Sequence, residues 1–178
     1  MRKVLYILGK LQDADLQWLL EAGSVRSLAP GELLIEEGQA IQSLYIVIQG
    51  ELAVVRSGTE LARLDVGEVV GEMSFLSSRP ASATVNALSP TTIFEIPQTR
   101  LKTKLRSDVQ FASRFHHAMC LFLVDRLDRT DALIGKGRRI AEETRVPGGG
   151  KISEDSMDSV VLAGARFNWF LERVRGHS

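Results

Sequence analysis

The residues best suited to chemistry lie in the segment 71–85, where glycine, a carboxylate, several small side chains and an arginine occur together. A carboxylate can accept hydrogen bonds from sugar hydroxyls, and small side chains leave backbone N–H groups accessible to an anion. These groups could hold a small phosphorylated sugar. We therefore take this segment, called the cassette below, as the candidate ligand-binding site. Its candidate residues are Gly71, Glu72, Met73, Ser74, Arg79, Ala81, Ser82 and Ala83.

Catalytic and metal chemistry have weaker support elsewhere in the chain. A metal-dependent β-barrel enzyme needs several histidines and a carboxylate that converge from strands. Of the 3 histidines, His116 and His117 are adjacent on a predicted helix and point about 100° apart, and His177 lies near the C-terminus. Cys120 falls in an apolar helical pattern with no neighbouring base to activate it. We expect no metal and no enzymatic activity.

The composition is that of a globular protein with balanced charge. The chain has 178 residues, enough for one domain and an appendage, and 44% of them are apolar and 25% charged. Its 22 basic side chains balance 22 acidic ones, which argues against binding to nucleic acid, because such binding depends on a basic face. The apolar run near the N-terminus is too short for a signal peptide or a membrane span. We expect a cytoplasmic protein with neither nucleic acid nor membrane as a partner.

The elements around the cassette change type along the chain. Apolar residues recur at helical spacing over 11–22, and between 24 and 97 short strands alternate with turn glycines. The clearest of the predicted strands are 43–49, 51–56, 60–64, 82–87 and 91–96. This pattern predicts an α+β fold, in which an antiparallel β jelly-roll barrel is flanked by an N-terminal helix and C-terminal helices.

Helical periodicity returns after residue 97, over 98–106 and 107–133. The apolar stripe of the second helix is wider than one surface helix needs, so either the last helix of the chain or a second copy should cover it. The stripe consists of Val109, Ala112, Phe115, Met119, Phe122, Val124 and Leu127. We expect a homodimer through 107–133. The predicted organisation is a domain at 1–133, a linker at 134–154 that contains three consecutive glycines, and an amphipathic helix within 155–178.

The ordered glycines and strands resemble the cyclic-nucleotide-binding domain family, which includes the bacterial cAMP receptor proteins, the regulatory subunits of protein kinase A and the cyclic-nucleotide-gated channels. The resemblance extends from about residue 8 to residue 133. It rests on barrel turns, on the strand-and-turn motif of 44–50, and on the Gly-Glu pair that begins the cassette. The turn and cassette residues that carry it are Gly31, Gly38, Gly67, Gly71 and Glu72.

The resemblance assigns roles within the cassette. The family pattern is Gly-Glu, a short helix, Pro-Arg, one further residue and Ala-Thr-Val. It implies that Glu72 accepts a hydrogen bond from the ribose 2′-hydroxyl, and that Ser82 and Ala83 approach the cyclic phosphate. It also implies a sensor whose ligand is cyclic AMP, with cyclic GMP as the alternative. Ligand binding would then move the helices from residue 98 onward.

The sequence departs from the family pattern at the residue that binds the phosphate. Ala81 stands where the family has its arginine, and Arg79 precedes Pro80 instead. A displacement of two residues along a strand moves a side chain about 6 to 7 Å. Arg79 therefore either reaches the phosphate, or faces solvent or pairs with Glu72. Glu72 and Ser82 also have alternatives to a role in ligand binding. Glu72 could accept hydrogen bonds from backbone N–H groups within a turn, and Ser82 could be an ordinary strand residue.

Two other functions compete with the sensor. Ala81 favours a ligand-free barrel that serves as a protein–protein interaction or dimerisation module. A transcription factor of the bacterial cAMP-receptor type would need a recognition helix packed on a second helix after residue 133. Only one convincing helix follows, and it begins in the acidic segment 153–158. We therefore expect no DNA-binding module.

Overall fold

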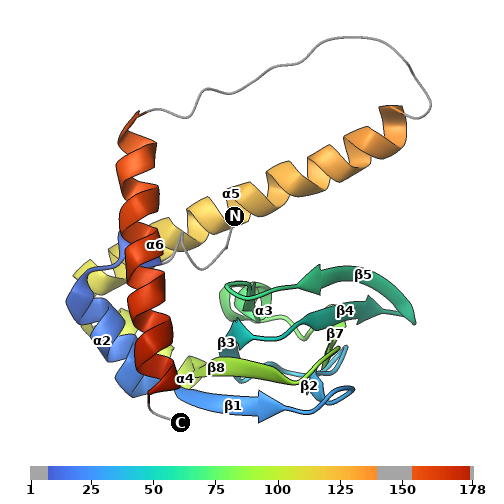
Figure 1. The fold of residues 1–178 in the computed structure, drawn as a ribbon, viewed down its shortest axis with the longest axis horizontal. Helices are drawn as coiled ribbons and strands as arrows, with labels where there is room; N and C mark the ends of the chain where they lie inside the picture. The colour runs from blue at the N-terminus through green and yellow to red at the C-terminus, as the bar shows by residue number, and fades with distance from the viewer. Residues whose placement is uncertain (1–7, 140–153, 177–178) are drawn as a thin grey trace.

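The computed structural model describes residues 8–139 and 154–176 (Figure 1). The elements in chain order are α2 (Asp13–Ala22), β1 (Ser24–Leu28), β2 (Leu33–Ile35), β3 (Ser43–Gln49), β4 (Leu52–Arg56), β5 (Thr59–Leu64), β6 (Val69–Val70), α3 (Glu72–Ser77), β7 (Thr84–Ala87), β8 (Thr91–Pro97), α4 (Gln98–Ser107), α5 (Val109–Arg139) and α6 (Glu154–Arg175). In the described ranges, each helix falls short of the length or hydropathy needed to cross a bilayer.

Two antiparallel four-stranded sheets form the jelly-roll barrel, in the orders β1-β8-β3-β6 and β2-β7-β4-β5. This confirms the α+β class and each of the five predicted strands, with small shifts at their ends. The structure adds β1, β2 and β6. Strand β6 pairs with β3 through Val70 and Tyr45, and it thereby brings Gly71, the first cassette residue, to the edge of the barrel.

Alternation along β3 separates two apolar cores, because successive side chains point to opposite faces of a sheet. Tyr45 and Val47 belong to the cluster inside the barrel, whereas Leu44, Ile46 and Ile48 belong to the cluster that the helices cover. We call these the inner and outer clusters. The inner cluster consists of Leu28, Ile35, Tyr45, Val47, Leu52, Leu64, Val70, Ala81, Val85, Ala87 and Ile93.

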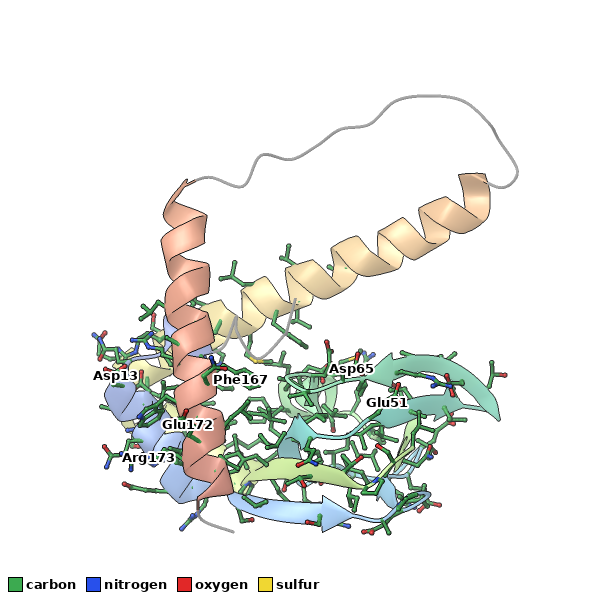
Figure 2. The ribbon with its side chains drawn as sticks, in the orientation of Figure 1. Asp13, Glu51, Asp65, Phe167, Glu172 and Arg173 are labelled. Carbon is green, nitrogen blue, oxygen red and sulfur yellow. The ribbon has the colours of Figure 1, made fainter. Side chains whose placement is uncertain are left out.

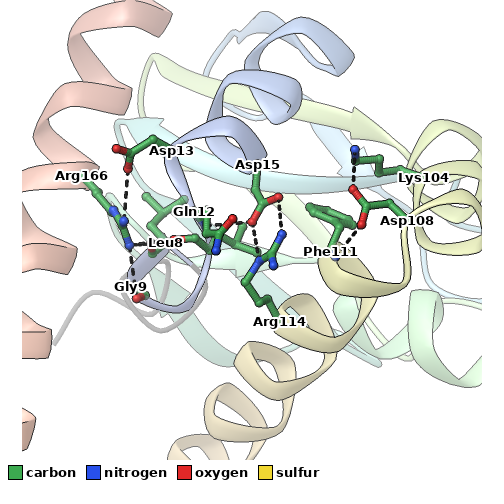
Figure 3. Close-up of polar contacts among 11 residues, drawn as sticks. Leu8, Gly9, Gln12, Asp13, Asp15, Lys104, Asp108, Phe111, Arg114 and Arg166 are labelled. Carbon is green, nitrogen blue, oxygen red and sulfur yellow. Dashed lines mark hydrogen bonds and ion pairs between the residues drawn. The ribbon is translucent and has the colours of Figure 1, made fainter.

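Helix α2 is tied to both helices that follow the barrel. At its start, the amide of Gln12 donates to Oδ2 of Asp15 at 2.8 Å, and Arg114 of α5 donates two hydrogen bonds to the same carboxylate at 2.7 and 2.9 Å (Figure 3). At its end, Nη1 of Arg100 in α4 donates to the carbonyls of residues 21 and 22, each at 3.1 Å. Helices α2, α4 and α5 therefore form one connected helical layer.

Helix α6 crosses this layer, and α5 extends beyond it over the barrel (Figure 1). Phe167 and Phe170 of α6 lie in the outer cluster with Phe115, Met119 and Phe122 of α5. The last helix of the same chain therefore covers the part of the predicted stripe that contains Phe115, Met119 and Phe122. Its other apolar members include Val109, Val124 and Leu127, which are 77%, 54% and 64% exposed.

The helix after α4 runs past its predicted end at residue 133 and continues to Arg139. The first residues of the predicted linker are therefore helical. The rest of that linker, 140–153, lies outside the described residues, as does His177. The last helix begins at Glu154 and ends at Arg175, close to its predicted bounds.

Candidate functional site

Gly71 opens the cassette in a conformation that suits glycine. Its φ is +91°, in the left-handed region, and its backbone passes close to the start of β3. A Cβ atom at this position would lie 2.7 Å from the carbonyl oxygen of Ser43. The chain needs this turn in order to leave β6 and begin α3 directly, and α3 starts at the next residue, Glu72.

Gly71→Ala should therefore lower the free energy of unfolding by about 1 to 2 kcal/mol or more, because strain and a steric clash add together. Gly164→Ala is a matched control on α6, where a new Cβ meets open space. That change should stabilise the protein by about 0.5 to 1 kcal/mol, since alanine has the higher helix propensity. Urea unfolding of both variants measures the contrast, and equal effects would contradict it.

Helix α3 buries one side of the cassette and exposes the other. Glu72 is 3% exposed and Met73 is 52% exposed. The hydroxyl of Ser74 donates to the backbone carbonyl of Arg79 at 2.5 Å, and the amide of Ser78 donates to the carbonyl of Ser74 at 2.8 Å. These bonds close the loop after α3 and fix where the chain returns toward the barrel.

Ala81 is anchored by its backbone and buried by its side chain. Its amide donates to the carbonyl of Gln39, and its own carbonyl accepts from the amide of Gly38, both at 2.8 Å. The methyl group belongs to the inner cluster and is 7% exposed. The position at which the resemblance expects an arginine therefore holds a small apolar side chain in the barrel interior.

The two residues after Ala81 present backbone donors. Within the described ranges, the amides of Ser82 and Ala83 form no hydrogen bond. Ser82 is exposed and Ala83 is half-buried. The next residue, Thr84, resumes the barrel, because its Oγ1 accepts from the amide of Glu37 at 3.1 Å. Consecutive free N–H groups beside small side chains can bind an anion.

Arg79 stands two residues before Ala81, and its side chain is exposed. In the part of the chain that the structure describes, its guanidinium makes no ion pair or hydrogen bond. The side chain therefore faces solvent, and its contact with a phosphate stays a prediction.

Aromatic contacts link the cassette to the helical layer. Phe75 of α3 meets Phe115 of α5 edge to face, with ring centroids 6.0 Å apart. Phe115 stacks on Phe111 at 5.7 Å, and Phe111 meets Trp18 of α2 at 5.4 Å. Lys102 of α4 places its Nζ 5.9 Å from the centre of the Phe75 ring. Sequence reasoning did not single out Phe75, although it is one helical turn after Gly71 on the buried side of α3.

Metal binding and catalysis find no added support among the described residues. There, no cluster of three or more His, Cys, Asp or Glu side chains is placed to hold a metal ion. A cavity of about 460 Å³ lies between α2 and α4, away from the cassette. Its lining residues are Trp18, Glu21, Ala22, Thr99, Arg100, Thr103, Lys104 and Ser107.

Comparisons with known proteins agree with this geometry. The family described as Cyclic nucleotide-binding domain matches residues 25–108. A cGMP-dependent protein kinase of Eimeria tenella is 34% identical over 86 residues, which are 48% of this chain and only 9% of the kinase. A cyclic nucleotide-binding domain from Methylobacillus flagellatus has the same fold, with a TM-score of 0.68 and 19% identity over 82% of this chain and 85% of that one.

A solved structure of the regulatory domain of Toxoplasma gondii PKA with cAMP is 26% identical, with a TM-score of 0.52. It covers 57% of this chain and 42% of that one. The family match, over 25–108, thus covers the barrel and α4. The chain spans less than a tenth of the length of the Eimeria tenella kinase.

Proposed function

Since residues 25–108 form a cyclic nucleotide-binding domain, we propose that the protein is a regulatory sensor that binds cyclic AMP at the cassette and transmits binding through α4 and α5. The observation that carries the proposal is the pair of free amides at Ser82 and Ala83, held beside the barrel by the hydrogen bonds of Ala81. A cyclic phosphate is an anion of the size that such a pair can accept.

The remaining cassette residues support the same ligand. Glu72 lies buried at the start of α3, where its carboxylate would accept from the ribose 2′-hydroxyl. Arg79 would supply the positive charge that the family pattern places at position 81. Binding at the cassette would act on Phe75, and through Phe115 it would act on α5. The role is one of binding and signalling, with no chemical reaction.

Isothermal titration calorimetry with cyclic AMP, and in parallel with cyclic GMP, tests the proposal. We expect saturable binding that both Glu72→Ala and Arg79→Ala weaken. Loss of the charge-assisted contact of Arg79 should cost roughly 1.5 to 3 kcal/mol, about 10- to 150-fold in affinity. Arg106→Ala is the matched control, because Arg106 is an exposed arginine of α4 outside the cassette. Absence of heat up to about a millimolar of either nucleotide would contradict the proposal, because a dissociation constant of that size corresponds to a binding free energy of only about 4 kcal/mol.

The second candidate function is a barrel retained for protein contacts without a ligand. The observation in its favour is Ala81, whose methyl group fills the barrel interior in place of an arginine. The exposed Val124 and Leu127 of α5 could serve as the contact surface of a homodimer. Light scattering of the purified chain, and of Leu127→Glu, would test this surface, since a charge at the centre of an apolar interface should dissociate a dimer.

A further inference from the structure

Arg56 ends β4 on the face of the strand that lines the barrel interior. Leu52 belongs to the inner cluster, and Val54 packs against it. Because alternate residues of a strand share a face and β4 pairs with β7 in regular register, Arg56 continues this row. Figure 2 shows Glu51 and Asp65 at the base of the β4–β5 hairpin, which runs from there away from α2 and α4. An apolar row of the barrel interior thus ends in a cation near the tip of the hairpin.

The register of β4 also brings Arg56 to the cassette. The β4–β7 ladder ends with Val55 opposite Thr84. The next position in that register puts Arg56 opposite Ala83, and Cβ atoms of directly opposite residues are about 4.5 to 5.5 Å apart. Among the described residues, the amides of Ser82 and Ala83 form no hydrogen bond. Arg56 therefore approaches the candidate anion site from the neighbouring strand.

A carboxylate from the turn after β2 meets Arg56 across the end of β7. Oε1 of Glu37 lies 3.9 Å from Nε of Arg56, and Oε2 accepts from the amide of Ser57 at 3.3 Å. The amide of Glu37 donates to Oγ1 of Thr84 at 3.1 Å. Since β7 lies between β2 and β4 in the sheet, these contacts cross the chain where the segment 82–83 leads into β7. Glu37 thus fixes the tip of the hairpin beside the cassette.

The ion pair between Arg56 and Glu37 is weak. Its 3.9 Å separation exceeds hydrogen-bond distance, and the two side chains are 61% and 39% exposed. Ion pairs of this kind add little to stability. An anion at 82–83 would offer Arg56 a charge-assisted contact through two N–H groups, which is the stronger interaction. Exchange of Glu37 for such an anion is therefore favourable.

We propose that Arg56 is a ligand-binding residue, which supplies from β4 the positive charge that Ala81 does not supply. Glu37, its partner in this structure, gives way to an anion bound at the amides of Ser82 and Ala83. That the anion is a cyclic phosphate rests on the proposed function. The contact of Arg56 with an anion at this place does not.

Calorimetry with cyclic AMP compares the parent protein with Arg56→Gln, which removes the charge. We expect binding about 10-fold weaker or more, because a charge-assisted contact is lost. The midpoint of thermal unfolding without nucleotide should be nearly unchanged, since the ion pair is exposed. Arg63→Gln is the matched control, because Arg63 is an exposed arginine of the same hairpin opposite Ala53, on the other face of the sheet. Equal affinities of Arg56→Gln and the parent protein would overturn the inference.

Glu37→Gln separates a ligand contact from a structural role. The variant keeps an oxygen that can accept from the amide of Ser57, and it removes the charge that pairs with Arg56. It should strengthen binding about 2- to 5-fold, because an exposed ion pair no longer competes with the anion. In the double variant with Arg56→Gln this gain should disappear. An equal gain with and without Arg56 would overturn the exchange of partners.

Nuclear magnetic resonance with inorganic phosphate decides the case in which the parent protein gives no heat with either cyclic nucleotide. That outcome would defeat the proposed function, and the amide signals of Ser82 and Ala83 would still report whether an anion binds beside Arg56. We expect phosphate to shift both signals in the parent protein and to shift them much less in Arg56→Gln. Equal shifts in the two proteins, or none in either, would overturn the inference.

Discussion

Replacement of Ala81 by arginine should strengthen the binding of cyclic AMP by about 10- to 150-fold, the equivalent of roughly 1.5 to 3 kcal/mol for a charge-assisted contact. The backbone is already fixed at this position, because the amide and carbonyl of Ala81 are both bonded to the turn at 38–39. The new guanidinium would begin next to the free amides of Ser82 and Ala83. Calorimetry on the parent protein and on Ala81→Arg measures the gain directly.

The same substitution should destabilise the protein when no nucleotide is present. The methyl group of Ala81 lies in the inner cluster, and a cation placed there loses hydration without gaining a partner. We expect Ala81→Arg to lower the midpoint of thermal unfolding, and saturating cyclic AMP to raise it again by mass action. Ala81→Gln adds similar bulk without charge and should bring no gain in affinity. Equal affinities of the parent protein and Ala81→Arg would show that the bound anion lies elsewhere.

Local patterns account for most of the predicted fold. Apolar runs bounded by turn glycines in β3 and β4, and helical spacing in α2 and α4, are visible within a few residues, so these elements were predicted close to their observed bounds. Strand β6 consists of only Val69 and Val70 and exists because it pairs with β3. A segment of that length has no period of its own, which is why sequence analysis missed it. Strands β1 and β2 lie in the region predicted to hold strands but were not delimited, and they likewise depend on partners far along the chain.

In the candidate site too, some features depend on local sequence and others on distant parts of the fold. The cassette is contiguous, so its limits could be predicted from spacing, whereas the direction of each side chain depends on the barrel around it. The burial of Ala81 in the inner cluster follows from its pairing with the turn at 38–39. Asp15 accepts the amide of Gln12, three residues before it in the first turn of α2. Its second partner, Arg114, lies 99 positions away, and no local pattern selects one arginine among many.

Arg114→Met should lower the free energy of unfolding by about 3 kcal/mol, because it leaves the carboxylate of Asp15 buried without its charged partner. Asp15 is 4% exposed, and among the described residues its hydrogen-bond donors are Arg114 and the amide of Gln12. The double variant Asp15→Leu with Arg114→Met should recover much of the loss, since it removes both charges. Arg63→Met breaks an exposed pair with Glu60 and should leave the unfolding midpoint nearly unchanged. Urea unfolding of these variants at neutral pH makes the comparison.

The pH dependence distinguishes this ion pair from simple packing. Burial raises the pKa of Asp15, but the hydrogen bonds from Arg114 and Gln12 and the charge of Arg114 outweigh burial, so the pKa lies below its ordinary value of 3.8. The stabilisation from this group is therefore complete above about pH 4 and is lost as the pH falls through the lower pKa of the folded state. In Arg114→Met, burial acts without that compensation, so Asp15 should destabilise the fold as it ionises. The difference in stability between the parent protein and Arg114→Met should widen from pH 3 to pH 6, and a constant difference over that range would assign the effect of Arg114 to packing.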